Sequence, residues 1–205
     1  MSIWVEWVKQ VKAISQIGKQ FSKDPYDLER YDQLQELSHE MFAQLGDAPK
    51  KKVDDFFIPD QGYATPKVDL RGAVFEEDRV LLVQERADGL WALPGGWADV
   101  CEPPSIGVVR EIFEESGYRT KVRKLAAVKD RGLHPFKPRY PTHIYKMYFL
   151  CELVGGTPTV NLEVSDIDFF NLDGLPELSE GKTIAADIAL MYEHHVSPEL
   201  ATYCD

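Results

Sequence analysis

The chain has 205 residues, enough for one large domain or for a domain with a small companion. Its 44% hydrophobic and 28% charged residues are typical of a globular protein and exclude intrinsic disorder. The net charge of −11 argues against nucleic acid as a partner, because nonspecific nucleic-acid binding relies on a basic face that displaces counterions from phosphates.

The N-terminal residues do not have the pattern of a signal peptide, since Glu6 interrupts the apolar residues and Lys9 and Lys12 follow it. No apolar stretch approaches the roughly 18 residues of a membrane span. The three cysteines are widely spaced and form no Cys-x-x-Cys pair, which indicates neither a disulfide framework nor a zinc ribbon. We therefore expect a cytoplasmic protein with no membrane partner.

The first 46 residues are predicted to form a helical hairpin. Apolar residues at three- and four-residue spacing over 3–17 indicate a first helix, with a break after Gly18. Asp24 followed by Pro25 is typical of a helix start, and Gly46 is a natural end for the second helix. The two apolar faces cannot both be covered within the hairpin, so we expect it to dock on the rest of the chain or on a second copy.

Residues 47–66 are predicted to be a linker, because they combine three prolines, a glycine and a run of three lysines. Residues 67–205 then show a different pattern, in which short strand-like runs predominate. Strand-like runs occur at 68–75, 79–84, 122–128, 144–153 and 167–172, and helical segments at about 105–116 and 183–194. Strands and helices without regular alternation predict an α/β fold: a mixed sheet with helices on both faces.

Three glutamates stand together in the helical segment 105–116. Glu111, Glu114 and Glu115 are spaced i, i+3 and i+4, which places them on one helix face, where like charges repel. Such a cluster is usually a solvated acidic face, but it also suits a hard cation such as Mg²⁺ or Mn²⁺. Arg110 lies beside the cluster and Glu102 precedes the helix, so a salt bridge between these two would pin the Gly-rich loop at 94–96 to the helix.

The complete spacing resembles the Nudix hydrolase box, Gly-x5-Glu-x7-Arg-Glu-U-x-Glu-Glu-x-Gly-U, where U is aliphatic. The matching residues are Gly96, Glu102, Arg110, Glu111, Ile112, Glu114, Glu115 and Gly117. Tyr118 departs from the pattern at the last aliphatic position, which puts packing in question rather than catalysis. The preceding segment, Trp91 to Gly96, is also similar to the usual lead-in to the box.

The resemblance implies a Nudix α/β/α sandwich over residues 67–195. The hairpin before it, with its Trp4-x-Glu-Trp7 sequence and its Lys-Asp-Pro-Tyr-Asp joint, resembles the N-terminal domain of one Nudix subgroup. Members of that subgroup are described as ADP-ribose or CDP-choline pyrophosphatases and commonly form homodimers. The implied activity is a divalent-metal-dependent hydrolysis of a nucleoside diphosphate linked to a moiety X, giving nucleoside monophosphate and phospho-X.

The resemblance also implies roles for the box residues. Glu111 and Glu115 are the first-choice ligands of Mg²⁺ or Mn²⁺, Glu114 is a ligand or a base, and the Gly96 carbonyl is a further ligand. Glu114 and Glu115 thereby count as catalytic residues. A metal ion there would neutralise the diphosphate and lower the pKa of the attacking water.

A second feature is the basic segment 119–139, which contains eight lysines and arginines and one aspartate. It is either a cluster that offsets substrate phosphates or an exposed strand edge protected by lysines. Arg131 and His134 are the substrate-binding candidates, because they lie beside a loop rich in proline and aromatic residues. Glu163 is a candidate general base in the loop before the strand at 167–172, or else a surface turn residue.

Two other functions remain open. A ligand-sensing Nudix module would bind ADP-ribose-like molecules without hydrolysis, but such modules typically lose box carboxylates and here all are present. An RNA-processing enzyme would need a long basic groove, which the acidic composition makes awkward. Neither the base nor the leaving moiety of the substrate can be read from the sequence.

Overall fold

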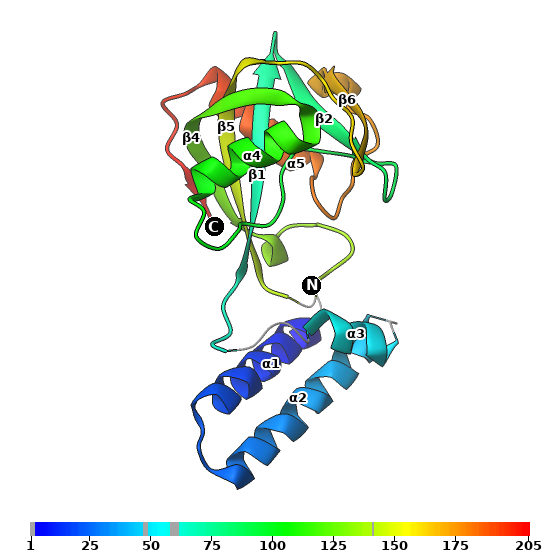
Figure 1. Ribbon diagram of the computed structural model, residues 1–205, viewed down its shortest axis with the longest axis vertical. Helices are drawn as coiled ribbons and strands as arrows, with labels where there is room; N and C mark the ends of the chain where they lie inside the picture. Colours follow the sequence, from blue (N-terminus) through cyan, green and yellow to red (C-terminus); the bar gives the residue numbers. More distant parts are fainter. Residues whose placement is uncertain (1–2, 47–48, 58–61, 141) are drawn as a thin grey trace. The chain divides into compact units, whose positions relative to one another are not determined.

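The computed structural model describes residues 3–46, 49–57, 62–140 and 142–205. The chain divides into two compact units, one made of residues 1–66 and 140–143 and the other of residues 67–139 and 144–205. The first unit is helical and the second contains the sheet (Figure 1).

The helices of the described residues are α1 (Ile3–Phe21), α2 (Pro25–Leu45), α3 (Lys50–Phe57), α4 (Pro104–Ser116) and α5 (Ala185–Val196), with 3-10 turns at Arg131–Leu133 and Leu172–Gly174. The strands are β1 (Lys67–Glu76), β2 (Arg79–Glu85), β3 (Trp91–Ala92), β4 (Tyr118–Asp130), β5 (Ile144–Gly156), β6 (Val164–Phe170) and β7 (Tyr203–Cys204).

The predicted helical hairpin is present as α1 and α2. Asp24 caps α2 by accepting hydrogen bonds from the backbone N–H groups of Tyr26 and Asp27, and the N–H of Gly46 closes its end on a main-chain carbonyl. Gly18 does not end the first helix, as the sequence suggested. It lies inside α1, where an added Cβ would come within 2.3 Å of the Tyr31 ring, so it permits close approach of the two helices.

Helix α3 corrects the prediction that residues 47–66 are only a linker. Its Val53 is buried against residues of α1 and α2, and Lys50 forms ion pairs with Glu36 at 2.7 Å and with Asp54 at 3.0 Å. The imidazole of His39 contacts Asp54 at 2.8 Å. The run of lysines at 50–52 hid the start of this helix, because it has no apolar residue that would give a periodic signal.

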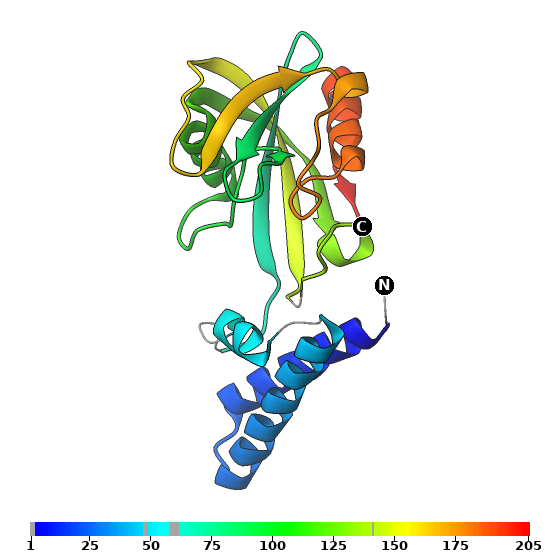
Figure 2. The same cartoon turned by 90° about the vertical axis from the view of Figure 1, so that its right-hand side faces the viewer.

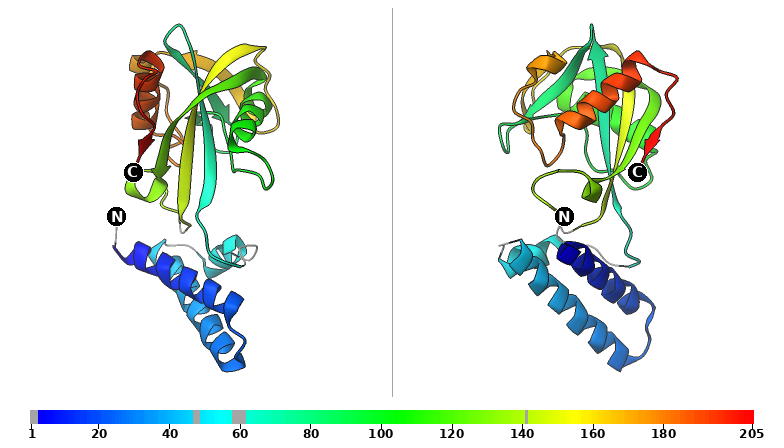
Figure 3. Two further views of the ribbon diagram at one scale, coloured as in Figure 1. Left: turned by 90° about the vertical axis from the view of Figure 1, so that its left-hand side faces the viewer. Right: turned by 180° about the vertical axis from the view of Figure 1, so that it is seen from behind.

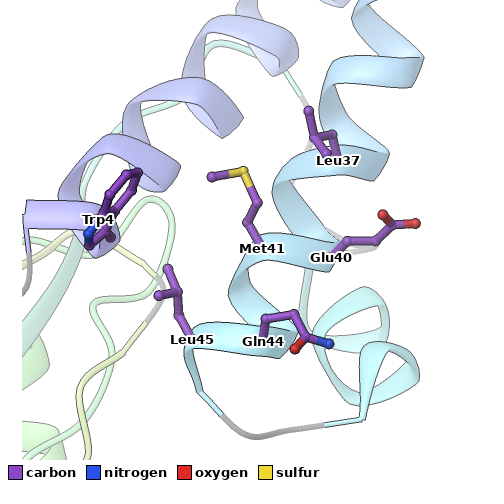
Figure 4. A pocket seen from close by; sticks show the side chains of 6 residues that line it. All are labelled: Trp4, Leu37, Glu40, Met41, Gln44 and Leu45. Carbon is purple, nitrogen blue, oxygen red and sulfur yellow. The ribbon is translucent and has the colours of Figure 1, made fainter.

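The hairpin keeps large apolar side chains exposed. Trp4 and Trp7 are 55% and 47% exposed and pack edge to face on each other, with ring centroids 5.1 Å apart. Met41 and Leu45 extend from α2 toward Trp4 and help to line a groove of about 350 Å³ (Figure 4). The apolar stripe predicted for α1 therefore leaves much of its surface uncovered in this chain.

The second unit confirms the predicted mixed sheet. The strand order is β3-β2-β1-β5-β4-β7, with β6 paired to β2. Strands β1 and β5 are parallel, whereas β4 with β5 and β1 with β2 are antiparallel. Helices α4 and α5 cover opposite faces of the sheet (Figures 2 and 3).

The two faces of the sheet differ in chemistry. Under α4 the core is apolar: Val108 and Ile112 pack on Leu70 and Val74 of β1. Gly72 lies beneath this helix, where an added Cβ would come within 2.4 Å of Ile112. The face under α5 is also largely apolar but encloses charged groups. One of them, Arg71, donates to the carbonyl of Leu93, just before the Gly-rich loop.

Two ion-pair groups are buried on that second face. Lys129 donates to Asp187 at 2.6 Å, and the Tyr148 hydroxyl donates to the second oxygen of the same carboxylate at 2.8 Å. Lys146 and Arg71 both donate to Asp69, at 2.8 and 2.7 Å. Buried charges are tolerated when they are paired and hydrogen-bonded in this way.

Candidate active site

Helix α4 positions the three clustered glutamates. It ends at Gly117, which has a left-handed conformation (φ 74°) and whose N–H returns to the carbonyl of Phe113. Its apolar side is anchored on β1, and the acidic groups flank that side: Glu111 and Glu115 are largely buried, and the Glu114 side chain is 55% exposed.

The Gly-rich loop lies along β1. The N–H groups of Leu70 and Gly72 donate to the carbonyls of Gly96 and Pro94 at 2.8 and 2.9 Å. Gly95 has φ 143°, and an added Cβ would come within 2.0 Å of the Leu70 carbonyl oxygen, so glycine is required there. This pairing fixes the loop next to the acidic helix.

Glu115 is bound directly to the loop. The N–H of Gly95 donates to its carboxylate at 2.8 Å. Burial raises the pKa of Glu115 to about 7, aided by repulsion from Glu111 and Glu85, while the charge of Arg71 and the Gly95 hydrogen bond oppose the rise. Burial also raises the pKa of Glu111.

Arg110 joins the acidic helix to the segment after the Gly-rich loop. The predicted ion pair with Glu102 is present, with Nε 3.0 Å from the carboxylate, and this contact lowers the pKa of Glu102. The same guanidinium reaches Glu111 at 3.0 Å, Glu114 at 2.7 Å and Asp99 at 3.1 Å. One arginine thus gathers four carboxylates around the helix and orients them.

Sequence reasoning missed three charged residues beside the box: Arg71, Glu85 and Lys182. Arg71 donates to the carbonyl of Leu93, at the start of the Gly-rich loop, at 3.0 Å. Glu85, at the end of β2, forms an ion pair with Lys182. For Arg71 and Glu85 the available signal was a charge inside a largely apolar strand, because such residues are rarely buried unless they are paired.

Tyr118, the departure from the box pattern, begins β4. Its ring packs edge to face on Phe169 with centroids 5.7 Å apart. An aromatic side chain therefore fills the position in which the box has an aliphatic one, and the helix end is undisturbed.

The two predicted substrate-binding residues lie in the loop after β4 and have partners both within that loop and elsewhere in the chain. Arg131 is only 4% exposed; its guanidinium lies over the Phe136 ring and donates to the carbonyls of Pro138 and Gly181. The His134 Nε2 lies 3.0 Å from the carboxylate of Asp205. These contacts give both residues a role in holding the loop, and their contact with a substrate stays a prediction.

The basic segment as a whole is largely engaged by the protein itself. Lys129 is buried against Asp187, Lys124 donates to carbonyls of the C-terminal segment, and Lys121 and Lys137 pair with surface glutamates. The structure therefore favours structural pairing over a continuous phosphate-binding surface for most of this cluster.

Glu163 lies in the exposed turn that leads into β6. Its N–H donates to the Asn161 side chain at 2.7 Å, and its carbonyl accepts from the N–H of Arg86 at 2.8 Å. The Asn161 side chain in turn donates to the Glu114 carbonyl at 2.5 Å, which attaches this turn to the acidic helix. Within the described part of the chain, the Glu163 carboxylate makes no hydrogen bond or ion pair.

The acidic site has the donors for a hard divalent cation. No group of three or more acidic, histidine or cysteine side chains in the described ranges is already gathered as a metal cage. Mg²⁺, however, keeps several waters and usually takes only one or two carboxylates. An added Cβ at Gly96 would lie 2.9 Å from the Glu111 carboxylate, so this glycine leaves the space beside Glu111 open. The residues present therefore fit Mg²⁺ or Mn²⁺.

Residues 66–190 match the family model described as the NUDIX domain, and residues 2–57 match that of a UDP-X-like, N-terminal oligomerisation domain. The chain belongs to the Nudix hydrolase family. It is therefore an enzyme of the class that hydrolyses phosphoric anhydride bonds. No helix in the described residues is long and apolar enough to cross a membrane.

This Nudix hydrolase is similar to several proteins over most of its length. YjhB of Bacillus subtilis (strain 168) is 39% identical over 202 residues, which cover 98% of this chain and 97% of that protein. The crystal structure of a UDP-X diphosphatase is 34% identical, covers 100% of this chain and 98% of its own, and has a TM-score of 0.64. An ADP-ribose pyrophosphatase structure from Streptococcus suis 89-1591 is 42% identical, covers 69% of this chain and 100% of its own, and has a TM-score of 0.63.

Proposed function

We propose that this enzyme hydrolyses a nucleoside diphosphate linked to a second moiety, in a reaction that depends on Mg²⁺ or Mn²⁺. The observation that carries the proposal is the largely buried Glu115, held by the Gly95 N–H in a Nudix box whose glutamates are all present. Water attacks one phosphorus of the diphosphate, the bridging P–O bond breaks, and the products are a nucleoside monophosphate and the phosphorylated moiety.

The residues that would hold the cation are Glu111, Glu114, Glu115 and the Gly96 carbonyl. That carbonyl accepts one hydrogen bond, from Leu70, and its second lone pair is available for a cation. The bound ion would neutralise the diphosphate and acidify the attacking water. The protein's own contribution is orientation: Arg110 and Gly95 fix the carboxylates so that little reorganisation is needed when substrate binds.

Three substrates are favoured, each by a different resemblance. The structures similar to this chain include an ADP-ribose pyrophosphatase and a UDP-X diphosphatase, and the latter matches along the whole chain. CDP-choline is the third candidate, from the resemblance of the helical hairpin to the N-terminal domain of the subgroup described as ADP-ribose or CDP-choline pyrophosphatases. All three share a nucleoside diphosphate esterified to a polar group.

A substrate panel tests this proposal. The enzyme is incubated with Mg²⁺ or Mn²⁺ and ADP-ribose, UDP-linked sugars, CDP-choline or short RNA, and products are resolved by chromatography. We expect nucleoside monophosphate and a phosphorylated product from at least one diphosphate, and no product when EDTA replaces the metal. Binding of ADP-ribose without turnover would instead support the sensing module, and RNA shortening alone would support the RNA-processing alternative.

We also propose that the helical unit forms a homodimer interface. Trp4 and Trp7 remain about half exposed, and tryptophan is enriched among residues that dominate interface energies. An exposed apolar groove beside them, lined by Met41 and Leu45, is rare on monomers and marks an interaction surface. Light scattering tests the assembly: we expect twice the chain mass of 23.3 kDa, and a monomer mass would contradict the proposal.

A further inference from the structure

Glu85 has one satisfied and one unsatisfied carboxylate oxygen. It is the last residue of β2, 8% exposed, and its N–H closes the turn to β3 by donating to the Leu90 carbonyl at 3.0 Å. Oε2 forms an ion pair with Lys182. Oε1 is buried and has no hydrogen-bond partner in the part of the chain that the structure describes. A buried charged oxygen without a partner is costly, which indicates that something else binds there.

The surroundings of Glu85 place it at the Nudix box. Thr183, next to Lys182, accepts a hydrogen bond from the N–H of Leu93 at 3.0 Å. Two residues further along the same loop, the N–H of Gly95 donates to Glu115. The adjacent residues Lys182 and Thr183 therefore connect Glu85 to this loop. The carboxylates of Glu85, at the end of β2, and of Glu115, in α4, therefore both lie beside the loop at 93–96.

The charges at this point also favour a cation. Lys182 pairs with Glu85, and Arg110 is shared among four carboxylates that include Glu111, so with Glu115 the carboxylates at this point outnumber these two cations. The Arg71 guanidinium faces the same loop but donates to Asp69 and to the Leu93 carbonyl, not to Glu85. The Oε1 of Glu85 thus remains available to a hard cation or to a water of its hydration shell, which oxygen donors suit.

We propose that Glu85 is a further oxygen donor of the divalent-cation site, acting through Oε1 while Lys182 holds Oε2. This inference rests on the proposed metal dependence of the enzyme. It adds a residue outside the Nudix box, from β2, whose other oxygen is paired with Lys182.

Direct Mn²⁺ binding tests the inference without relying on turnover. Free Mn²⁺ is followed by electron paramagnetic resonance during titration of the full chain and of single variants. We expect Glu85→Gln to weaken Mn²⁺ binding by roughly 10–100-fold, the range for groups that support metal ligands. Lys182→Met should bind Mn²⁺ at least as tightly as wild type, because it removes a competing positive charge. Glu177→Gln, an exposed control, should bind like wild type.

A merely structural ion pair gives a different pattern. In that case Glu85→Gln and Lys182→Met would lower the melting temperature by similar amounts and leave Mn²⁺ affinity unchanged, which would overturn the inference. Glu85→Asp keeps the negative charge but shortens the side chain by one methylene, which moves the carboxylate away from the cation site. This variant provides the same test if Glu85→Gln does not fold. It should also bind Mn²⁺ more weakly.

Glu115→Gln distinguishes a failure of the inference about Glu85 from a failure of the proposed function. If wild type binds Mn²⁺, Glu115→Gln weakens binding and Glu85→Gln does not, the inference about Glu85 is wrong and the proposed function stands. If wild type itself binds no Mn²⁺ and hydrolyses no diphosphate, the proposed function fails with it.

Discussion

The helical unit (residues 1–66 and 140–143) and the catalytic unit (residues 67–139 and 144–205) differ in which groups they bury. The catalytic unit buries charge: Lys146 is fully enclosed, and its ammonium is paired with Asp69 at 2.8 Å. The helical unit leaves apolar surface exposed, with Ile3, Trp4 and Ile14 each more than half exposed. One unit therefore pairs buried charges such as Lys146 and Asp69 internally, whereas the other has apolar groups that remain in water.

This difference indicates how each unit obtains its stability. A buried ion pair contributes little net free energy but is very costly to break, so the catalytic unit depends on each partner being present. An exposed apolar stripe gains free energy only when another surface covers it. The match of residues 2–57 to an oligomerisation domain agrees with that interpretation.

The largest effect on stability should come from breaking a buried ion pair of the catalytic unit. Asp187 accepts hydrogen bonds from Lys129, the Tyr148 hydroxyl and the Ile184 N–H. Asp187→Ala leaves these donors unpaired, and we expect a loss of roughly 3–5 kcal/mol in the free energy of unfolding. Urea denaturation measures it. A loss below about 1 kcal/mol would show that the pair is not structurally required.

Removing a carboxylate from the box should affect activity and leave the fold intact. Glu115→Gln deletes an anionic ligand, and we expect turnover to fall by roughly 10³-fold or more, equivalent to about 4 kcal/mol. Circular dichroism should be unchanged, because repulsion from Glu85 and Glu111 is relieved. Activity near wild type at saturating Mg²⁺ would remove Glu115 from the metal site.

The same variant isolates a pH dependence of stability. In the folded enzyme the pKa of Glu115 is about 7, against an ordinary value of 4.5. Between these values the folded state holds a proton that the unfolded state has released, so the contribution of Glu115 to stability falls as pH rises. With EDTA present, the stability of wild type relative to Glu115→Gln should decline from about pH 5 to about pH 7 and then level off. A flat difference would contradict this assignment.

Truncating the exposed tryptophans should act on assembly more than on the fold. For Trp4→Ala with Trp7→Ala we expect the dimer to weaken by about 2 kcal/mol or more, roughly 30-fold in dissociation constant. Sedimentation equilibrium provides the measurement. Leu162→Ala, a change of an exposed apolar residue in the catalytic unit, serves as the control and should leave the dimer unchanged.

The smallest effect is expected at Glu163. Its side chain is exposed and its hydrogen bonds are made by the backbone, so Glu163→Gln should change turnover by less than about fivefold, whereas loss of a general base typically costs 10²–10⁴-fold. A loss of that larger size would establish Glu163 as the base, brought to the site by the turn that Asn161 attaches to α4.

Local signals account for what the sequence could predict. Asp24-Pro25, Gly46 and Gly117 mark helix ends through their own backbone chemistry, and the spacing of the box fixes Glu111 and Glu115 on one face. These features depend on residues within a few positions of one another, so they are visible without a tertiary structure.

The features that the sequence could not predict depend on pairing between residues far apart in the chain. Lys129 and Asp187 are 58 positions apart, and Glu85 and Lys182 are 97 apart, so neither partner reveals the other in the sequence. The basic segment looked like a phosphate-binding surface because its partners, such as Asp187, lie elsewhere in the chain. Charge counts along a chain do not show which charges are already neutralised.

Helix α3 sets where the protein can be divided. Val53 completes the core formed by Val8, Phe42 and Ala43, and Lys50 ties the helix to Glu36. A deletion of residues 1–46 would leave the eight-residue helix α3 attached to the catalytic unit, with Val53 no longer covered. A shortened protein that begins at Lys67 removes the helical unit without leaving that remnant, and it is the form in which the catalytic unit should be produced alone.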